Sequence, residues 1–384
     1  MRTQFQENKD INNSAINITI IENINDFEAL KNDWNKLAEG LAPINSFEWM
    51  FIWWKNFKSN NELKILVAKK NEKIVGIAPI YVENTKALKF LKFRKLCFLG
   101  GEISDYLDFL IEKSSDRENI FLSLLDFALN NISYDYLELK RINTGYPNFD
   151  MWQKYAGEKK LEFKLSKECP VLKLTDYDKY DQYFGKISKS LKRNLTTRQN
   201  KLQKDGFNIE IVFKNDITEE DIRLIGDINL NRQLYKVNKG ELKRFCYFSD
   251  HKKHTFIKDY FCNNSNNSKI LAYFKLNGII VSYILALVNE TTLFYWNTAV
   301  NTDYLSYGPS KFLIREMIKF AFEKNLKYFD FMRGKSSYKL EWSNSQTENY
   351  NLSAKLSLKS KLIYLYRNHR PKFMKKEYSF SENP

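Results

Sequence analysis

The order of secondary structure that the sequence predicts occurs twice along the chain. Residues 63 to 82 show a hairpin pattern of two apolar runs around a polar turn, and residues 268 to 288 repeat it. When Asn71 is aligned with Asn277, three apolar positions of the second run coincide in the two hairpins. Two hairpins alone could match by chance, so the residues that follow them decide whether the chain holds two copies of one unit.

A helix and a strand follow each hairpin. Apolar residues recur at helical spacing from 118 to 130 and again from 310 to 324, and strand patterns follow at 134 to 142 and at 327 to 332. Because a helix between two strands of one sheet implies a parallel crossover, each copy should be an α/β unit. We therefore predict the α/β (α+β) class, with two tandem halves, each a mixed twisted sheet flanked by helices.

The length of 384 residues agrees with two domains of ordinary size. We expect a disordered polar N-terminus at 1–15, an N-terminal domain at 16–175, a C-terminal domain at 176–365 and a basic tail at 366–384. The second domain should begin with a helix at 186–204, which has one apolar stripe and carries basic but no acidic residues.

Several classes of protein are disfavoured by the sequence pattern. The longest apolar run, at 279–288, is much shorter than the roughly 20 residues of a membrane span, and the first residues lack the apolar segment of a secretory signal. The four cysteines and three histidines are not spaced as metal ligands or as a disulfide framework. We therefore expect a cytoplasmic protein without a metal site.

The formal charge of +15 favours anionic partners, although charge alone does not indicate DNA binding. The segment 355 to 376 mixes leucines and tyrosines with basic residues, as a membrane-surface helix does, and peripheral membrane contact is one interpretation. A strand followed by a packed terminal helix fits the same residues better. The oligomeric state cannot be inferred from these features.

Five segments in a fixed order carry a resemblance to a known family. They are SFEWMFIWWKNF, VGIAPIY, FLGGEISDYLDFLI, SLKRNLTTRQNKL and YLSYGPSKFLIREMIKFAFEKNLKYFDFMRGKSSYKLEW. Together, over roughly residues 25 to 355, they resemble the CelD/BcsL-type acetyltransferase-like family of bacterial polysaccharide gene clusters, which is related to the Fem aminoacyltransferases.

This resemblance implies a tandem GNAT fold and a GNAT-type acyltransferase with acyl-CoA as co-substrate and no metal. The acyl group, expected to be acetyl, would go to an amino or hydroxyl group of a sugar, nucleotide-sugar or lipid-linked glycan intermediate in polysaccharide biosynthesis. Two alternatives are a Fem-like transferase that uses aminoacyl-tRNA and a non-catalytic binding protein for glycan assembly. The chain departs from the usual pattern because it lacks a glycine-rich diphosphate loop.

The acyl-CoA diphosphate is predicted to lie at the start of the helix that opens at Gly308. A glycine followed by a proline suits the start of a helix, and the next backbone amides, those of Ser310, Lys311 and Phe312, have no partner within the helix. Lys311 could add a positive charge. The alternative is that these residues only begin a helix.

Candidate acid–base residues follow two glycines after a predicted strand. Asp105 is the first candidate for the general base and Asp108 the second, and alternation along an extended chain predicts that they point to opposite sides. The alternative is that they cap a turn or meet an arginine. Tyr338, after the last strand of the second copy, is the candidate proton donor.

The remaining candidates would hold an anionic or aromatic-stacking substrate. Lys192 and Arg193 lie on the basic helix, and Trp296 lies on a predicted strand. Arg333 and Lys339 lie beside Asp330 at a strand end, where ligands of open α/β sheets commonly bind. An ion pair from Arg333 to Asp330 or Glu341 is the alternative for this group.

Overall fold

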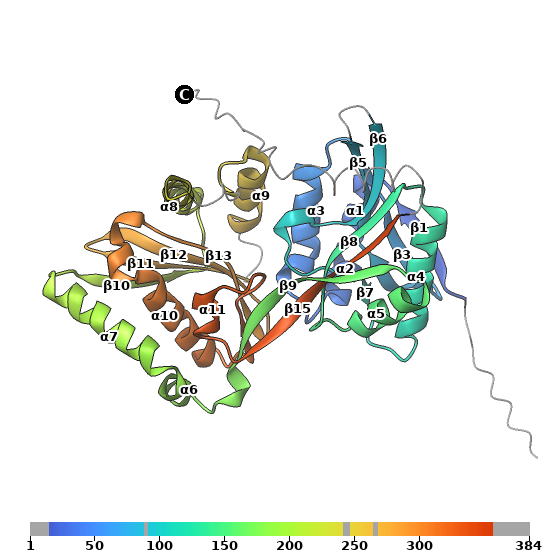
Figure 1. Cartoon of the computed structure of the whole chain (residues 1–384). Coiled ribbons are helices and arrows are strands. Elements are labelled where there is room, and N and C mark those ends of the chain that lie inside the picture. The colour runs from blue at the N-terminus through green and yellow to red at the C-terminus, as the bar shows by residue number, and fades with distance from the viewer. Residues whose placement is uncertain (1–14, 88–90, 241–245, 264–267, 356–384) are drawn as a thin grey trace, which may run out of the picture.

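The computed structural model describes residues 15–87, 91–240, 246–263 and 268–355. Within these residues, strands from both halves of the chain form one sheet of eleven strands in the order β10-β11-β12-β13-β14-β9-β15-β8-β6-β5-β2, beside a small sheet in the order β1-β3-β4-β7. Figure 1 shows the two halves side by side, joined through β9 and β15. The predicted N-terminus at 1–15, except for its last residue, and the predicted tail lie outside the described residues, as does most of segment 355 to 376.

The N-terminal half ends with strand β9 and the short turn that follows it. Its helices are α1 (Ile24–Ala29), α2 (Lys31–Leu37), α3 (Phe47–Phe57), α4 (Arg117–Asn131) and α5 (Phe149–Glu158), with short 3-10 turns η1 (Pro43–Asn45), η2 (Gly101–Ile103) and η3 (Leu174–Asp176). Its strands are β1 (Asn17–Ile21), β2 (Glu62–Leu63), β3 (Ile65–Lys70), β4 (Lys73–Ala78), β5 (Ile80–Ala87), β6 (Leu91–Phe98), β7 (Leu110–Ile111), β8 (Tyr136–Asn143) and β9 (Glu162–Lys173). The predicted hairpin, helix and strand are β3–β4, α4 and β8.

The C-terminal half repeats the same order after two added helices. Its helices are α6 (Tyr180–Lys186), α7 (Lys189–Lys204), α8 (Glu219–Asn238), α9 (His251–Phe261), α10 (Pro309–Glu323) and α11 (Ser337–Leu340), with the 3-10 turn η4 (Thr302–Tyr307). Its strands are β10 (Ile209–Lys214), β11 (Lys269–Leu276), β12 (Ile279–Val288), β13 (Thr292–Val300), β14 (Tyr328–Asp330) and β15 (Ser345–Lys355).

The last strand of the described chain completes the sheet of the other half. Strand β15 lies between β8 and β9 and pairs antiparallel with both. The end of β9 in turn pairs antiparallel with β14, so that Val171 lies opposite both Asp330 and Ser345. This exchange was not predicted, because the pattern of a strand does not specify its partner. Each half therefore depends on a strand of the other.

Aromatic side chains join the halves on the helical side of the sheet. Trp49 of α3 packs edge-on against Phe256 and Tyr260 of α9, with ring centroids 4.9 and 4.8 Å apart, and against Trp296 at 5.7 Å. Helix α3 begins where the Ser46 side chain accepts a hydrogen bond from the Trp49 amide, which fixes the direction of the tryptophan-rich face. The tryptophan-rich helix α3 thus forms a contact with α9 of the other half.

No helix within the described ranges is long and apolar enough to cross a membrane. In the same ranges, no cluster of three or more His, Cys, Asp or Glu side chains could hold a metal ion.

Candidate active site at the junction of the two halves

The central strands of the C-terminal half separate next to Asp330. Strands β13 and β14 run parallel and pair from Thr292–Tyr328 to Phe294–Asp330. Strand β14 ends there and Met332 turns the backbone with a φ of 57°, whereas β13 stays paired with β12 as far as Val300. The two strands thus open a split that starts at a carboxylate.

The N-terminal half contains a copy of this feature. Strands β6 and β8 run parallel and pair as far as Cys97–Glu138, and Arg141 has a φ of 71° just beyond. The motifs Tyr136-x-Glu138-x-x-Arg141 and Tyr328-x-Asp330-x-x-Arg333 match in the two copies. In the N-terminal copy, the backbone amide of Leu107 donates a 3.0 Å hydrogen bond to the Arg141 carbonyl. The loop between β6 and β7 therefore lies beside β8 where the C-terminal copy has its split.

Charged groups from both halves meet at the junction. The Arg333 Nε lies 3.1 Å from the Asp105 Oδ1. The Tyr106 hydroxyl donates a 2.8 Å hydrogen bond to the Asp330 Oδ1, which also accepts one from the Met332 amide at 2.6 Å. Two residues that are adjacent in the N-terminal half therefore bind the carboxylate and the arginine of the C-terminal motif.

Asp330 lines a cavity of about 460 Å³, which we call the junction cavity. Its lining includes Tyr106, Asn143, Thr292 and Thr347. Asp330 is 7% exposed, and burial raises its pKa to about 7, against the hydrogen bonds from Met332 and Tyr106 that lower it. A carboxylate with this pKa can exchange a proton with a ligand near neutral pH.

The matching carboxylate of the N-terminal half is in the opposite electrostatic state. The Glu138 carboxylate lies 2.9 Å from the Lys95 ammonium and 3.1 Å from that of Lys140. Although burial acts to raise it, the pKa of Glu138 is lowered by these two lysines. Glu138 is therefore held ionised, and proton exchange near neutrality is left to Asp330.

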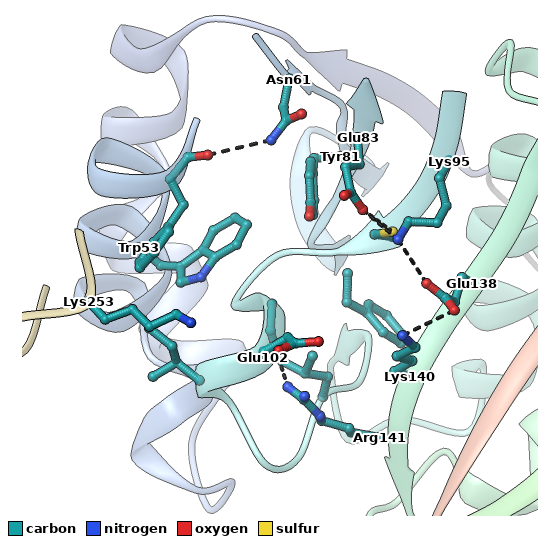
Figure 2. Close-up of a pocket in the computed structure, with 16 residues that line it drawn as sticks. Trp53, Asn61, Tyr81, Glu83, Lys95, Glu102, Glu138, Lys140, Arg141 and Lys253 are labelled. Atoms are coloured by element: carbon teal, nitrogen blue, oxygen red, sulfur yellow. Dashed lines mark hydrogen bonds and ion pairs between the residues drawn. The ribbon is translucent and has the colours of Figure 1, made fainter. Parts of the chain in front are cut away.

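A second cavity, which we call the N-terminal cavity, lies against α3 and encloses about 320 Å³. Figure 2 shows its aromatic wall at Trp53 and Tyr81, the Lys95 ammonium between the carboxylates of Glu83 and Glu138, and Arg141 on the opposite side. The loop that carries Asp105 contributes Gly101, Glu102, Ile103 and Leu107 to this cavity and Tyr106 to the junction cavity.

The two predicted aspartates have separate partners. Asp105 pairs with Arg333 at the junction and is 8% exposed. Asp108 is 1% exposed in the N-terminal core, where its Oδ1 accepts hydrogen bonds from the Trp152 Nε1 at 2.7 Å and from the Phe109 amide at 2.8 Å. The ion pair of Arg333 with Asp105 also corrects the predicted alternative, an ion pair to Asp330 or Glu341, because the turn after β14 directs the guanidinium towards the other half.

We expect Asp108→Asn to leave turnover unchanged and to alter the pH dependence of stability. Burial raises the pKa of Asp108 to about 6, above the value of roughly 4 in an unfolded chain. The folded protein therefore holds this proton more tightly, and stability should fall as pH rises from about 4 to about 6. Asparagine can accept the same hydrogen bonds without a charge, so urea unfolding at several pH values should show that this decrease is gone. A large loss of turnover in the folded variant would instead make Asp108 catalytic.

The predicted diphosphate site has the backbone of a helix start. Gly308 has a φ of 63° and is followed by Pro309 as the first residue of α10. The Ser310 hydroxyl lies 3.3 Å from that of Ser282, and the Lys311 ammonium lies 2.6 Å from the Glu341 carboxylate. The Phe312 side chain stacks on Phe274 in the core, and the Lys311 amide, which was predicted to lack a partner, donates to the Gly308 carbonyl at 3.0 Å.

Two cations of α7 that were not predicted approach this helix start. The Arg198 Nη1 donates to the carbonyls of Leu305 and Ser306 at 3.2 and 2.8 Å, and the Lys201 ammonium lies 3.0 Å from the Ser306 hydroxyl. Arg198 lies on the apolar stripe of α7, where a charged side chain is unexpected, and this signal could have identified it. The predicted Lys192 and Arg193 lie further from this turn along α7; Lys192 donates to the Gly185 carbonyl at 2.5 Å, and Arg193 is exposed.

The other predicted substrate and acid–base residues are mostly packed. Trp296 is 9% exposed and stacks on Tyr247 at 5.7 Å between the halves. The Lys339 ammonium donates to the carbonyls of Met332 and Arg333 at 3.3 and 3.0 Å, which supports the turn after β14. Tyr338 is half-buried beside Tyr295 of β13, on the face of the sheet opposite to Asp330. Burial raises the pKa of Tyr338.

Comparisons with known proteins agree with this architecture. Residues 189–340 match the sequence profile of the acetyltransferase (GNAT) domain. Among curated protein sequences, none matches the chain significantly. A conserved protein of unknown function from Bacteroides thetaiotaomicron VPI-5482 has a similar structure, with a TM-score of 0.54 at 13% identity over 89% of this chain and 100% of that one. The structure of FemX is similar with a TM-score of 0.58 at 11% identity, over 87% of this chain and 98% of FemX.

Residues 189–340 therefore match a GNAT acetyltransferase domain, and the chain shares its fold with FemX. At this level of identity the similarity to solved structures concerns the fold alone. Membership of the CelD/BcsL-type family remains a prediction.

Proposed function

We propose that the protein transfers an acyl group from acyl-CoA to an amino or hydroxyl group of a sugar, nucleotide-sugar or lipid-linked glycan, and that the reaction takes place in the C-terminal half. The observation that carries this proposal is the split between β13 and β14, which begins at Asp330. The split gives a thioester a path between Asp330 and Tyr338, which lie on opposite sides of the sheet.

The donor diphosphate would bind at the turn from η4 into α10. Pro309 has no amide hydrogen and the Lys311 amide donates to the Gly308 carbonyl at 3.0 Å, which leaves the Ser310 amide in the first turn of α10 for an anion that the helix dipole favours. Arg198 and Lys201 bring two positive charges to the same turn, where without an anion they would face the positive end of the dipole. A diphosphate would compensate both features.

Asp330 would act as the general base. It lines the junction cavity, where an acceptor can bind, and its pKa of about 7 allows it to take the proton of the attacking nitrogen or oxygen. The acceptor atom then forms a bond to the thioester carbonyl carbon, and the carbon–sulfur bond breaks. Tyr338, on the other side of the split, would return a proton to the leaving thiolate of coenzyme A.

We expect Ser310→Asp to weaken acetyl-CoA binding. An aspartate in a first helical turn stabilises the helix, so the variant should fold, but its carboxylate would repel the diphosphate. The expected loss is on the order of 1–3 kcal/mol, as for a lost charge-assisted hydrogen bond, and calorimetry measures it. Ser188→Asp, at the start of α7, adds the same charge to another helix and serves as the control. Unchanged binding by folded Ser310→Asp would move the donor elsewhere.

The same titration separates the rival functions. Similarity to the fold of FemX is the observation that favours an aminoacyl-tRNA donor, although fold similarity does not determine the donor. Saturable binding of charged tRNA without binding of acetyl-CoA would support that donor. Binding of glycans without either donor would support a non-catalytic binding protein.

A further inference from the structure

A buried arginine without an acidic partner lines the N-terminal cavity. Arg141 is 6% exposed, and its Nη1 donates to the carbonyl oxygens of Gly101 and Ser104, the latter at 2.6 Å. Among the residues that the structure describes, no carboxylate forms an ion pair with its guanidinium. Its equivalent in the other copy, Arg333, pairs with Asp105. The copies therefore differ in whether the protein itself neutralises this arginine.

The lining of the cavity carries four cations, Lys95, Lys140, Arg141 and Lys253, and three carboxylates, Glu83, Glu102 and Glu138. Burial and the nearby Arg333 lower the pKa of Arg141, whereas the nearby Asp105 and Glu102 raise it without forming an ion pair with its guanidinium. Lys140 and Lys253 line the same cavity, and Figure 2 shows Lys253 reaching towards it from the C-terminal half. A buried, undercompensated guanidinium facing a cavity is suited to bind a phosphate or carboxylate, since its N–H groups match the oxygens of such an anion.

The opposite side of the cavity offers hydrogen-bond acceptors and a flat apolar wall. Lys95 lies 2.5 Å from the Glu83 carboxylate and 2.9 Å from that of Glu138, and oxygens with more than one lone pair can accept further hydrogen bonds. The Trp53 ring is 4% exposed and closes this wall between the Gly101 backbone and Phe57, on which it stacks at 5.5 Å. Carboxylates accept the hydroxyl protons of a sugar, and an apolar wall accommodates the C–H groups of its ring.

We propose that the N-terminal cavity binds a monosaccharide unit that carries one anionic group, with Arg141 on the anion, the carboxylates of Glu83 and Glu138 on the hydroxyls, and Trp53 beside the ring. The volume of about 320 Å³ is near the lower limit of ligand sites and accommodates one sugar ring with one such group. The site is separate from the split in the C-terminal half and needs no acyl donor. Its test is therefore independent of the proposed function.

The test is calorimetric titration of the intact protein with glucose 1-phosphate, glucuronate, glucose and inorganic phosphate. At least one of the two anionic sugars should bind, and the preferred one distinguishes phosphate from carboxylate. Arg141→Gln should weaken that binding about tenfold to a hundredfold, the range of a lost charge-assisted hydrogen bond. Arg94→Gln serves as the control, because Arg94 lies in the same sheet outside the cavity and pairs with Glu62 at 2.8 Å.

Three results would overturn the proposal. They are the absence of binding by both anionic sugars, binding of glucose as tight as that of the anionic sugars, and unchanged binding by folded Arg141→Gln. If Arg141→Gln does not fold, Lys140→Glu decides instead, because its side chain is 41% exposed and its replacement adds a carboxylate at the cavity wall. Weaker binding of the anionic sugar by this variant supports the site, and unchanged binding overturns it.

Discussion

Asp330→Asn is expected to lower turnover by roughly 10²- to 10⁴-fold while the protein still folds and binds its donor. This range is the usual contribution of a general base, and asparagine cannot accept the acceptor's proton. The variant should fold because an amide oxygen can still accept the hydrogen bonds from the Tyr106 hydroxyl and the Met332 amide. Steady-state kinetics with acetyl-CoA and an acceptor measures the loss.

The matched control is Glu138→Gln, the same change at the equivalent position of the N-terminal copy. Because Lys95 and Lys140 hold Glu138 ionised, it should not transfer protons, so any effect of its replacement should appear as weaker sugar binding in the N-terminal cavity and not as a loss of turnover at saturating acceptor. Equal losses in the two variants would mean that the charge loss acts through folding or binding. Wild-type turnover in folded Asp330→Asn would remove Asp330 from the mechanism.

The pH profile gives a separate test of Asp330. A general base works in its ionised form, and burial raises the pKa of Asp330 to about 7. Turnover should therefore be nearly constant above about pH 8 and should fall about tenfold for each pH unit below about 6. A profile that stays flat down to pH 5 would contradict this role, since no group with a pKa of about 7 would then control the reaction.

Much of the fold could be predicted because its elements follow from local patterns. The hairpin of β3 and β4, helix α4 and strand β8 all agree with the periodicity of apolar residues, as do α10 and β14 in the second copy. The exchange of β15 could not be predicted, since alternation along a strand fixes which side chains are buried but not which strand lies next to it. The partner is chosen by contacts between residues far apart in the sequence.

The candidate site was harder to predict for the same reason. The sequence favours Asp105 as the base because it follows two glycines after a strand, whereas the contacts that distinguish Asp105 from Asp330 each come from the other half of the chain. The repeated motif that ends in Arg141 and Arg333 was the available signal, since it aligns Glu138 with Asp330. Whether each carboxylate meets lysines or a tyrosine depends on tertiary packing.

The isolated N-terminal half, residues 1–175, is expected not to fold. Without β15, strands β8 and β9 would lose the partner that pairs with both of them, and buried backbone groups would be left without hydrogen bonds, at about 1–3 kcal/mol each. Leu352, which is fully buried in the N-terminal core, would leave a cavity costing about 2–5 kcal/mol. Asn349, also fully buried, accepts a 2.8 Å hydrogen bond from the Asn143 amide and donates one of 2.8 Å to the Asp105 carbonyl.

Together, a few such losses exceed the total stability of a typical domain, which is about 5–15 kcal/mol. The control is the same fragment with β15 restored through a short turn. This connection is feasible because β9 and β15 are antiparallel neighbours, and the Lys173 amide donates a 2.8 Å hydrogen bond to the Asn344 side chain. Residues 1–173 joined by a glycine-containing turn to 344–355 should therefore show cooperative unfolding and dispersed amide signals. If residues 1–175 alone gave the same spectra, β15 would be a replaceable addition, and each half would fold without the other.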